Sequence, residues 1–245
     1  MLKVKRYAKI LGLTIAVLLL GTFTTSAEPA VSINMNGRNT SVLDILLFTT
    51  LISLLPIIVL MMTSFTRITI VFSFLKNAMG TTQVPPSQVI VGLSLMLTVF
   101  IMSPVIKQID TQAYTPYKNG ELTQEQAIKA ATVPLKSFML KQTKKADMAL
   151  FLNISKSKRP EKVEDIGLEV VVPAFIISEL KRAFIMGFCL FVPFLIIDMV
   201  VSSILMSLGM MMLPPAMISL PFKILIFILA DGWNLLVKSL VTSFR

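Results

Sequence analysis

The stretch Val170–Leu208 reads VVVPAFIISELKRAFIMGFCLFVPFLIIDMVVSSILMSL and is the longest apolar region of the chain. A membrane-spanning helix needs about 20 residues, so this region is too long for one simple span. It is interrupted by the charged run from Glu179 to Arg182, by Pro193 and by Asp198. A lone ionisable group at bilayer depth costs at least about 2.5 kcal/mol, and prolines free backbone groups that protein or water must satisfy. The pattern therefore predicts helices that contact protein as well as lipid.

Three further apolar regions flank this stretch. Ile45–Thr66 and Val89–Ile106 precede it and predict a helical hairpin whose connector carries Arg67 and Lys76. Leu213–Ala230 follows it and contains three prolines and a lysine. Taken along the chain, the predicted segments are a cleaved signal peptide at 1–27, a short extracytoplasmic segment at 28–44, a first hydrophobic hairpin at 45–106, a polar periplasmic helical module at 107–169 and a second hydrophobic region at 170–245.

The composition places the chain among membrane proteins and predicts an all-α fold. Hydrophobic residues make up 55% of the 245 residues and charged residues 15%, with a mean hydropathy of +0.80. The net charge of +10 is diluted by acidic residues in the polar module, which argues against a nucleic-acid partner. The chain has no His and one Cys, Cys189, which excludes a Ser-His-Asp triad, a Cys-His dyad and a His-based metal site. With no Gly-rich phosphate loop either, the sequence predicts no enzyme activity and no cofactor.

The N-terminal residues have the order of a secretory signal peptide. Lys3, Lys5, Arg6 and Lys9 precede a short apolar run, and small residues end at Ala27. We expect cleavage after Ala27, with a retained anchor helix as the alternative. Cleavage would put the mature N-terminus outside the cytoplasm, and four spans would then put the polar module outside as well.

The polar module carries clear helix signals. Thr123 and Gln126 form a capping-box pattern, and Pro134 is suited to open a further helix. Phe138 lies on an apolar face of that second helix, and Phe151 lies in a short apolar run after it. Both phenylalanines either pack inside the module or contact another subunit.

Ionisable residues in or beside the last two apolar regions are balanced in sign, which suggests pairing. They are Glu179, Lys181, Arg182, Asp198, Lys223 and Asp231. Buried pairs that fix helix register or subunit contacts are one interpretation. A proton relay through Asp198 or Glu179 is the other, and it would suit a proton-coupled secondary carrier for a small solute.

Three consecutive methionines, Met210, Met211 and Met212, stand between Gly209 and Leu213-Pro214-Pro215. Gly and the double proline oppose a continuous helix, so a loop is predicted. Thioether side chains are long and deformable, and several copies converging on an axis would close a channel around its cargo. The alternative is that they fill gaps between helices.

Many residues at fixed spacings resemble the FliP family of flagellar type III export gates, which is related to the SctR proteins of injectisomes. In the first half these are Phe65-Thr66-Arg67-Ile68, Pro86 and Gln88, Gly92-Leu93, Leu97-Thr98 and Phe100, and Met102 with Pro104-Val105. In the second half they are Glu179-Leu180-Lys181, Ala183-Phe184, Gly187-Phe188, Pro193-Phe194, Ile197-Asp198, Gly209-Met210-Met211, Pro214-Pro215, Ser219-Leu220-Pro221, Lys223 and Asp231-Gly232-Trp233.

The resemblance implies a core, pore-forming subunit of the export gate in the bacterial inner membrane, multi-pass and part of the flagellar basal body. Its helical hairpins would assemble as a homo-oligomer, a pentamer, with FliQ and FliR and beside export-apparatus proteins such as FlhB and FlhA. Unfolded flagellar proteins would be the substrates. A secondary carrier would instead need a midplane binding site, often built from repeated halves, and no internal repeat is evident.

The resemblance also implies roles for particular residues. Met210, Met211 and Met212 match the family's methionine gasket, which limits ion leakage during export. Glu179 and Lys223 fall at matching charged positions, and we expect them to pair between neighbouring subunits. Phe138 and Phe151 would contribute to oligomer contacts, and Asp198, Arg182 and Asp231 would be buried ionisable residues.

Overall fold

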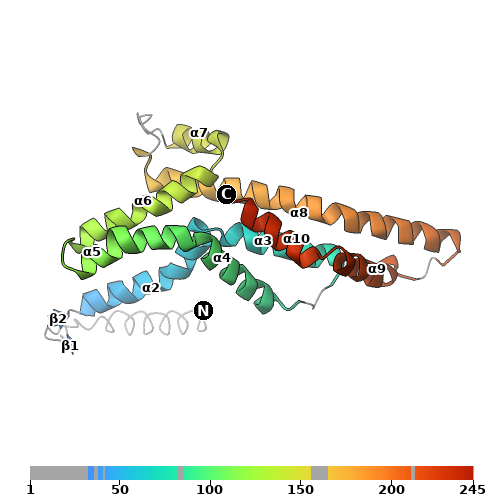
Figure 1. Ribbon diagram of the computed structural model, residues 1–245, viewed down its shortest axis with the longest axis horizontal. Coiled ribbons are helices and arrows are strands. Elements are labelled where there is room, and N and C mark those ends of the chain that lie inside the picture. Colours follow the sequence, from blue (N-terminus) through green and yellow to red (C-terminus); the bar gives the residue numbers. More distant parts are fainter. Residues whose placement is uncertain are drawn as a thin grey trace, which may run out of the picture. The chain divides into compact units, whose positions relative to one another are not determined.

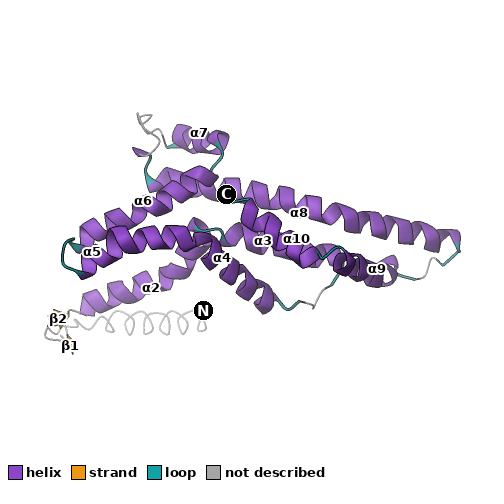
Figure 2. Ribbon diagram, in the orientation of Figure 1, coloured by secondary structure: helices purple, strands orange, loops and turns teal. Residues whose placement is uncertain are grey.

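The computed structural model describes residues 33–35, 38–40, 42–81, 85–155, 165–210 and 213–244. The predicted signal peptide and most of the segment 28–44 lie outside these residues. The chain divides into two units, Met1–Leu55 and Pro56–Arg245, and each is described by itself. The predicted all-α architecture is confirmed, since nearly all described residues are helical (Figure 2).

The first unit contains a short hairpin and the beginning of a helix. Strand β1 (Ile33–Met35) pairs antiparallel with β2 (Arg38–Thr40), with Met35 opposite Arg38. The dipeptide Asn36-Gly37, which favours a turn, falls between the strands and lies outside the described residues. Helix α2 (Val42–Met62) starts in this unit and continues into the second through Pro56.

The second unit is organised around α3 (Phe65–Met79), which occupies most of the predicted hairpin connector. Its buried residues recur at helical spacing and face the core; they are Ile68, Val71, Phe72, Leu75, Ala78 and Met79. Helix α3 packs most extensively against α8 (Leu168–Ser207), and its role as the connector of a hairpin of two spans stays a prediction. The segment is the central core helix of the unit.

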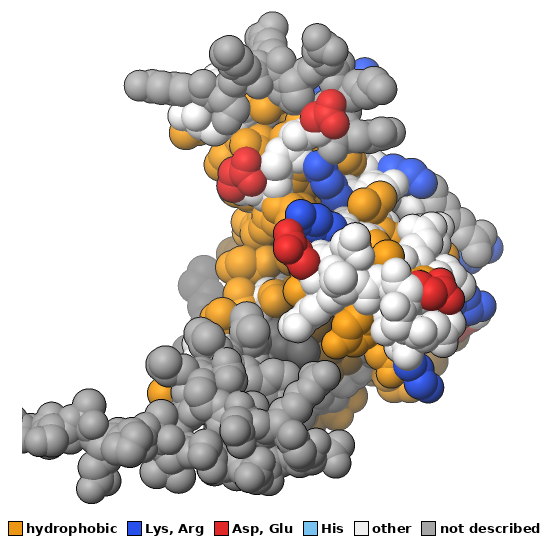
Figure 3. Space-filling view, turned by 90° about the vertical axis from the view of Figure 1, so that its left-hand side faces the viewer, with side chains coloured by type: hydrophobic (Ala, Val, Ile, Leu, Met, Phe, Trp, Pro, Cys, Tyr) orange, Lys and Arg blue, Asp and Glu red, His pale blue; other side chains and the backbone are white. Residues whose placement is uncertain are grey.

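A continuous helical rod follows α3. It consists of α4 (Ser87–Ile109), the π-helical turn η1 (Asp110–Tyr114) and α5 (Thr115–Lys118). The boundary predicted at Lys107 is therefore a change of composition and not a break in the helix. Figure 3 shows acidic and basic side chains interspersed with apolar ones at the end of the molecule that carries α5, without a large area of one sign.

The polar module folds back along this rod. Helix α6 (Gln124–Gln142) lies beside α4 and η1, and α7 (Lys145–Ile154) lies over the start of α8 (Figure 1). The capping box at Thr123 and Gln126 is confirmed, with both reciprocal hydrogen bonds formed. The helix does not restart at Pro134, which lies inside α6. A proline lacks only one donor, and the packing of α6 against α8 maintains the helix across it.

Helix α8 runs through the apolar stretch Val170–Leu208 as far as Ser207. Its 40 residues include Pro173 and Pro193, and the helix continues through both prolines and through the charged run that interrupts the apolar sequence. After α8 come α9 (Pro215–Leu229) and α10 (Gly232–Thr242), which are bent by 64° at Asp231. Asp231 takes a left-handed conformation with φ of 49°, which accounts for this sharp turn.

Within the described residues, two helices are long and apolar enough to cross a membrane, Ser87–Lys118 and Leu168–Ser207. The number rises to four if Ile52–Met62 with Phe65–Met79 and Pro215–Leu229 with Gly232–Thr242 each count as one bent span. The fold is therefore compatible with the prediction that each of the four apolar regions crosses a membrane.

Candidate functional site

A buried ion pair stands at the junction of α3 and α8. Arg67 Nε donates to Glu179 Oε2 at 2.8 Å, and Arg67 Nη2 donates to Glu179 Oε1. Both side chains have no exposed surface. The two parallel bonds make a bidentate contact, the strongest and most directional geometry for these groups.

The other Arg67 donors bind groups from two more helices. Nη1 donates to the carbonyl oxygen of Ser243 at 3.1 Å and to its hydroxyl at 2.9 Å, and Nη2 donates to Gln142 Oε1 at 3.2 Å. The guanidinium lies 3.7 Å from the centre of the Phe244 ring. Gln142 also accepts from Arg182 at 2.8 Å and donates to the carbonyl of Phe244 at 3.0 Å. One arginine therefore joins α3, α6, α8 and the end of α10.

A second ionic cluster joins α8 and α9. Lys223 Nζ donates to Asp198 Oδ2 at 2.6 Å and to the carbonyl of Ala78 at 3.1 Å. The Ser219 hydroxyl donates to the other Asp198 oxygen at 2.5 Å. Lys223 is buried and the Asp198 side chain is one-third exposed. The pairing suggested by the balanced charges is thus formed here within one chain.

A third cluster attaches α7 to α8. Asp147 accepts from Lys181 Nζ and, at 2.7 Å, from the Ser178 hydroxyl, which itself accepts from the Lys144 backbone N–H. Mainly through its hydrogen bond, Lys181 holds the pKa of Asp147 below its ordinary value. Asp147 is buried, so this carboxylate stabilises the docking of α7 while it remains charged.

The depressed pKa of Asp147 predicts an acid-sensitive contribution to stability. A carboxyl group with a lowered folded-state pKa stabilises the fold above its unfolded value, near pH 4, and loses that effect as the pH falls through the folded value. Asp147→Asn should therefore lower the thermal midpoint at pH 7, and the gap to the unchanged chain should close below pH 4. Asp165→Asn, at an exposed position, is the control and should leave the profile unaltered. A gap that is constant across this range would contradict the assignment.

The remaining predicted residues occupy different positions. Glu179 and Lys223 belong to separate clusters, and each has an opposite partner in its own chain; their pairing across subunits stays a prediction. Asp231 is exposed in the single chain, and its burial in an assembly stays a prediction. Its place at a left-handed turn explains why an aspartate is tolerated beside apolar helices. Arg182 and Asp198 are only partly buried.

Phe138 and Phe151 pack around one hydrophobic cluster. Its buried members are Met139, Met148, Ile166, Val170, Val171, Ala174 and Phe175. The Phe138 ring contacts Phe175 edge-on, with centroids 6.0 Å apart, and stacks on Phe244 at 6.3 Å. Packing inside the chain therefore occurs, and a role in oligomer contacts stays a prediction.

The loop predicted at the three methionines starts as expected. Gly209, with φ of 73°, ends α8 in a Schellman motif: its N–H donates to Met206 O, and the N–H of Met210 donates to Leu205 O. Met210 is exposed, while Met211 and Met212 lie outside the described residues.

The sequence did not reveal the central role of Arg67 and Gln142. Arg67 borders an apolar region just as Lys223 lies in another, and this similarity is the signal that would have placed it among the candidate pairs. Gln142 is one polar residue among several near the end of α6, and no local pattern marks it. In the described part of the chain no three Cys, Asp or Glu side chains come together as a metal site. The clusters connect helices, and their charged groups are engaged in structural contacts.

The chain is similar to flagellar proteins along nearly its whole length. A family model described as the FliP family matches residues 48–240. The flagellar biosynthetic protein FliP of Bacillus subtilis is 53% identical over 204 residues, covering 83% of this chain and 92% of the relative. FliP of Pectobacterium carotovorum is 45% identical over 248 residues, covering 100% and 95%. FliP of Aquifex aeolicus is 47% identical over 237 residues, covering 96% and 99%.

Proposed function

The chain belongs to the FliP family, and on that basis we propose that it is a pore-forming subunit of the flagellar type III protein export gate. As a family member it is a component of the flagellar export apparatus with apolar helices that suit a membrane location. The finer proposal is a homo-oligomer, a pentamer, in the bacterial inner membrane that conducts unfolded flagellar proteins. FliQ, FliR, FlhB and FlhA are the proposed partners.

The observation that carries this proposal is the exposed apolar surface of α8. The helix has 40 residues, and only 11% of its most apolar segment of 18 residues is buried within the chain. Such a surface needs lipid or other protein to cover it. A subunit of a membrane assembly satisfies this need, and Glu179, Lys181 and Asp198 of α8 are paired inside the chain.

The role proposed for Met210, Met211 and Met212 is to seal the conduit. Met210 follows the glycine-ended turn that closes the long helix α8, and Met211 and Met212 are the next residues in the sequence. In a ring of subunits, deformable thioethers from every copy would meet and close around a passing chain. Neither catalysis nor a cofactor has a place in this function.

Replacing all three methionines by Ala is expected to leave assembly intact and to make the membrane permeable to small ions. Alanine is too short to fill the central space, so water and ions pass. The measurement is ion conductance of membranes that contain the assembled gate, with the oligomer checked by its mass in detergent.

The control is a triple Ala variant at three exposed methionines that lie within helices, Met96, Met199 and Met217. It should not raise conductance. Equal conductance of the two variants would reject the sealing role of the three methionines. Ion conduction by a chain that forms no oligomer would reject the proposal that an oligomer forms the pore.

A further inference from the structure

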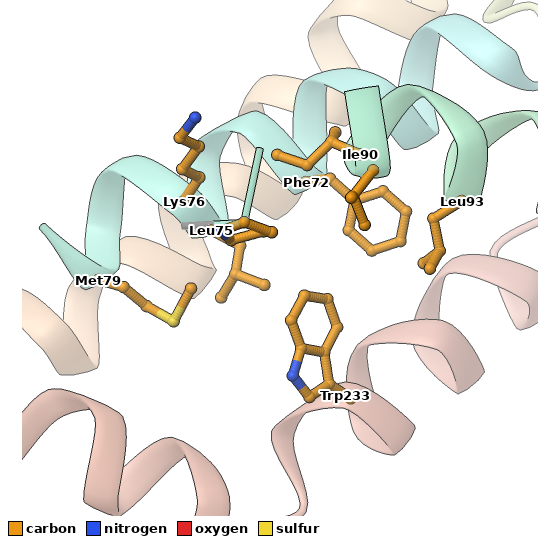
Figure 4. A pocket seen from close by; sticks show the side chains of 9 residues that line it. Phe72, Leu75, Lys76, Met79, Ile90, Leu93 and Trp233 are labelled. Carbon is orange, nitrogen blue, oxygen red and sulfur yellow. The ribbon is translucent and has the colours of Figure 1, made fainter. Parts of the chain in front are cut away.

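A small apolar pocket lies between α3, α4 and the beginning of α10 (Figure 4). Its volume is about 160 Å³, smaller than the pockets of about 300–1,000 Å³ that enclose whole small ligands. The space suits one end of an apolar chain. The side chains that surround it are Phe72, Leu75, Met79, Ile90, Leu93 and Trp233.

A polar groove of about 500 Å³ adjoins this pocket, and Lys76 and Ile90 line both. Figure 4 shows the carbon stem of Lys76 beside Leu75, with its ammonium pointing away from the apolar side chains. The groove is lined by hydroxyl and amide groups of Thr69, Ser73, Asn77, Thr81 and Ser87. The apolar pocket and the polar groove therefore meet at the side chain of Lys76.

The groove favours an anion. No described carboxylate pairs with Lys76, although it is half-buried. Helix α4 begins at Ser87 after Pro86, with no side-chain cap and no acidic residue in its first turn, so free N–H groups and the positive helix end face this region. The Thr69 hydroxyl in the groove is buried and has no hydrogen-bond partner among the described residues.

The position along the helices matches the level of lipid headgroups. The candidate span Ser87–Lys118 starts at the groove, and Leu95, Val99 and Phe100 expose apolar surface further along it. Trp233, which closes the pocket, is 43% exposed, and partly exposed Trp is typical of membrane interfaces.

We propose that the pocket and the groove together bind one anionic phospholipid, with the end of an acyl chain among Phe72, Leu93 and Trp233 and the phosphate at Lys76. Basic pockets between membrane helices are known to bind lipid headgroups. The zwitterionic lipids carry a cationic group for which the groove offers no carboxylate among the described residues, so the site discriminates by headgroup charge.

Native mass spectrometry of the full detergent-solubilised chain tests the proposal, with phosphatidylglycerol as the probe and phosphatidylcholine of the same chain length for comparison. Phosphatidylglycerol should bind at one site, more tightly than phosphatidylcholine. Lys76→Gln should weaken that binding about fivefold, the effect expected for one lysine near an anionic lipid. Leu93→Phe, which fills the pocket without changing charge, should weaken it too.

Lys107→Gln removes the same charge from the exposed far end of α4 and is the matched control. It should leave binding unchanged. The proposal is overturned if both lysine variants lose binding equally, if the two lipids bind equally, or if glycerol 3-phosphate without acyl chains competes at the concentration of the lipid. Should Lys76→Gln fail to fold by circular dichroism, undiminished binding by Leu93→Phe also overturns it.

Discussion

Replacing Glu179 by Gln is expected to destabilise the chain by about 3 to 5 kcal/mol, the usual effect of breaking a buried ion pair on one side. The substitution keeps the shape of the side chain but leaves the Arg67 guanidinium charged, fully buried and without a counter-ion. Gln142 and Ser243 still accept hydrogen bonds from Arg67, yet neither carries a negative charge. The midpoint of urea unfolding of the detergent-solubilised chain measures the effect.

Glu125→Gln is the matched control, because Glu125 forms an exposed pair with Lys129 one helical turn away. Its expected effect is about 0.5 kcal/mol or less. Arg67→Met combined with Glu179→Leu should be more stable than Glu179→Gln, since no buried charge remains. An unfolding midpoint of Glu179→Gln equal to that of the unchanged chain would show that the pair is not needed.

This experiment also bears on the pairing of Glu179 with Lys223 of a neighbouring subunit. A Glu179 variant that fails to form oligomers has either lost a contact between chains or lost the internal pair with Arg67. Unfolding of the isolated chain distinguishes the two, because only the second lowers the midpoint before assembly.

Gly187→Ala is expected to destabilise the chain by about 1 to 3 kcal/mol through overpacking. A Cβ at Gly187 would lie 2.5 Å from Phe74 Cγ and 2.9 Å from its Cβ, so the ring has no small movement that relieves the clash. Phe74 is further held edge-on against Phe184, with centroids 5.5 Å apart. The two helices would have to separate, and α3 and α8 form the main packing of the unit.

Gly92→Ala is the control, and it is expected to raise the stability of the chain where Gly187→Ala lowers it. Gly92 lies inside α4 with no atom within 4 Å of the added methyl group. There alanine should stabilise the helix by about 0.5 to 1 kcal/mol, because it lowers the entropy of the unfolded chain. Urea midpoints that shift in the same direction for both variants would contradict the close approach of α3 and α8 at Gly187.

Much of the fold follows from local sequence patterns. The all-α class, the capping box at Thr123 and the glycine-ended helix before Met210 depend on neighbouring residues, and all three are confirmed. The path of the chain near Pro134 and Pro193 depends on distant packing, which overrides the local tendency of proline to end a helix. At Pro134 the local signal predicted a helix start that the structure does not have.

The sequence predicts that the candidate site contains ion pairs, but it does not identify which residues pair. Balanced charges in apolar regions indicated ion pairs, and Asp198 with Lys223 is one. The partner of Glu179 is 112 positions away, in a segment that reads as a connector because Arg67 and Lys76 lie in it. No spacing rule links such residues, so the three-dimensional packing of α3 on α8 is needed to join them.

The length of α8 has a mechanical consequence. At about 1.5 Å per residue, its 40 residues span about 60 Å, twice the thickness of the hydrocarbon layer. One end is fastened by Val171 and Phe175 to the cluster beneath α6 and α7, and the other ends beside Met210. One continuous helix therefore links the two, so a displacement of the Val171–Phe175 end along the helix axis would be transmitted to Met210.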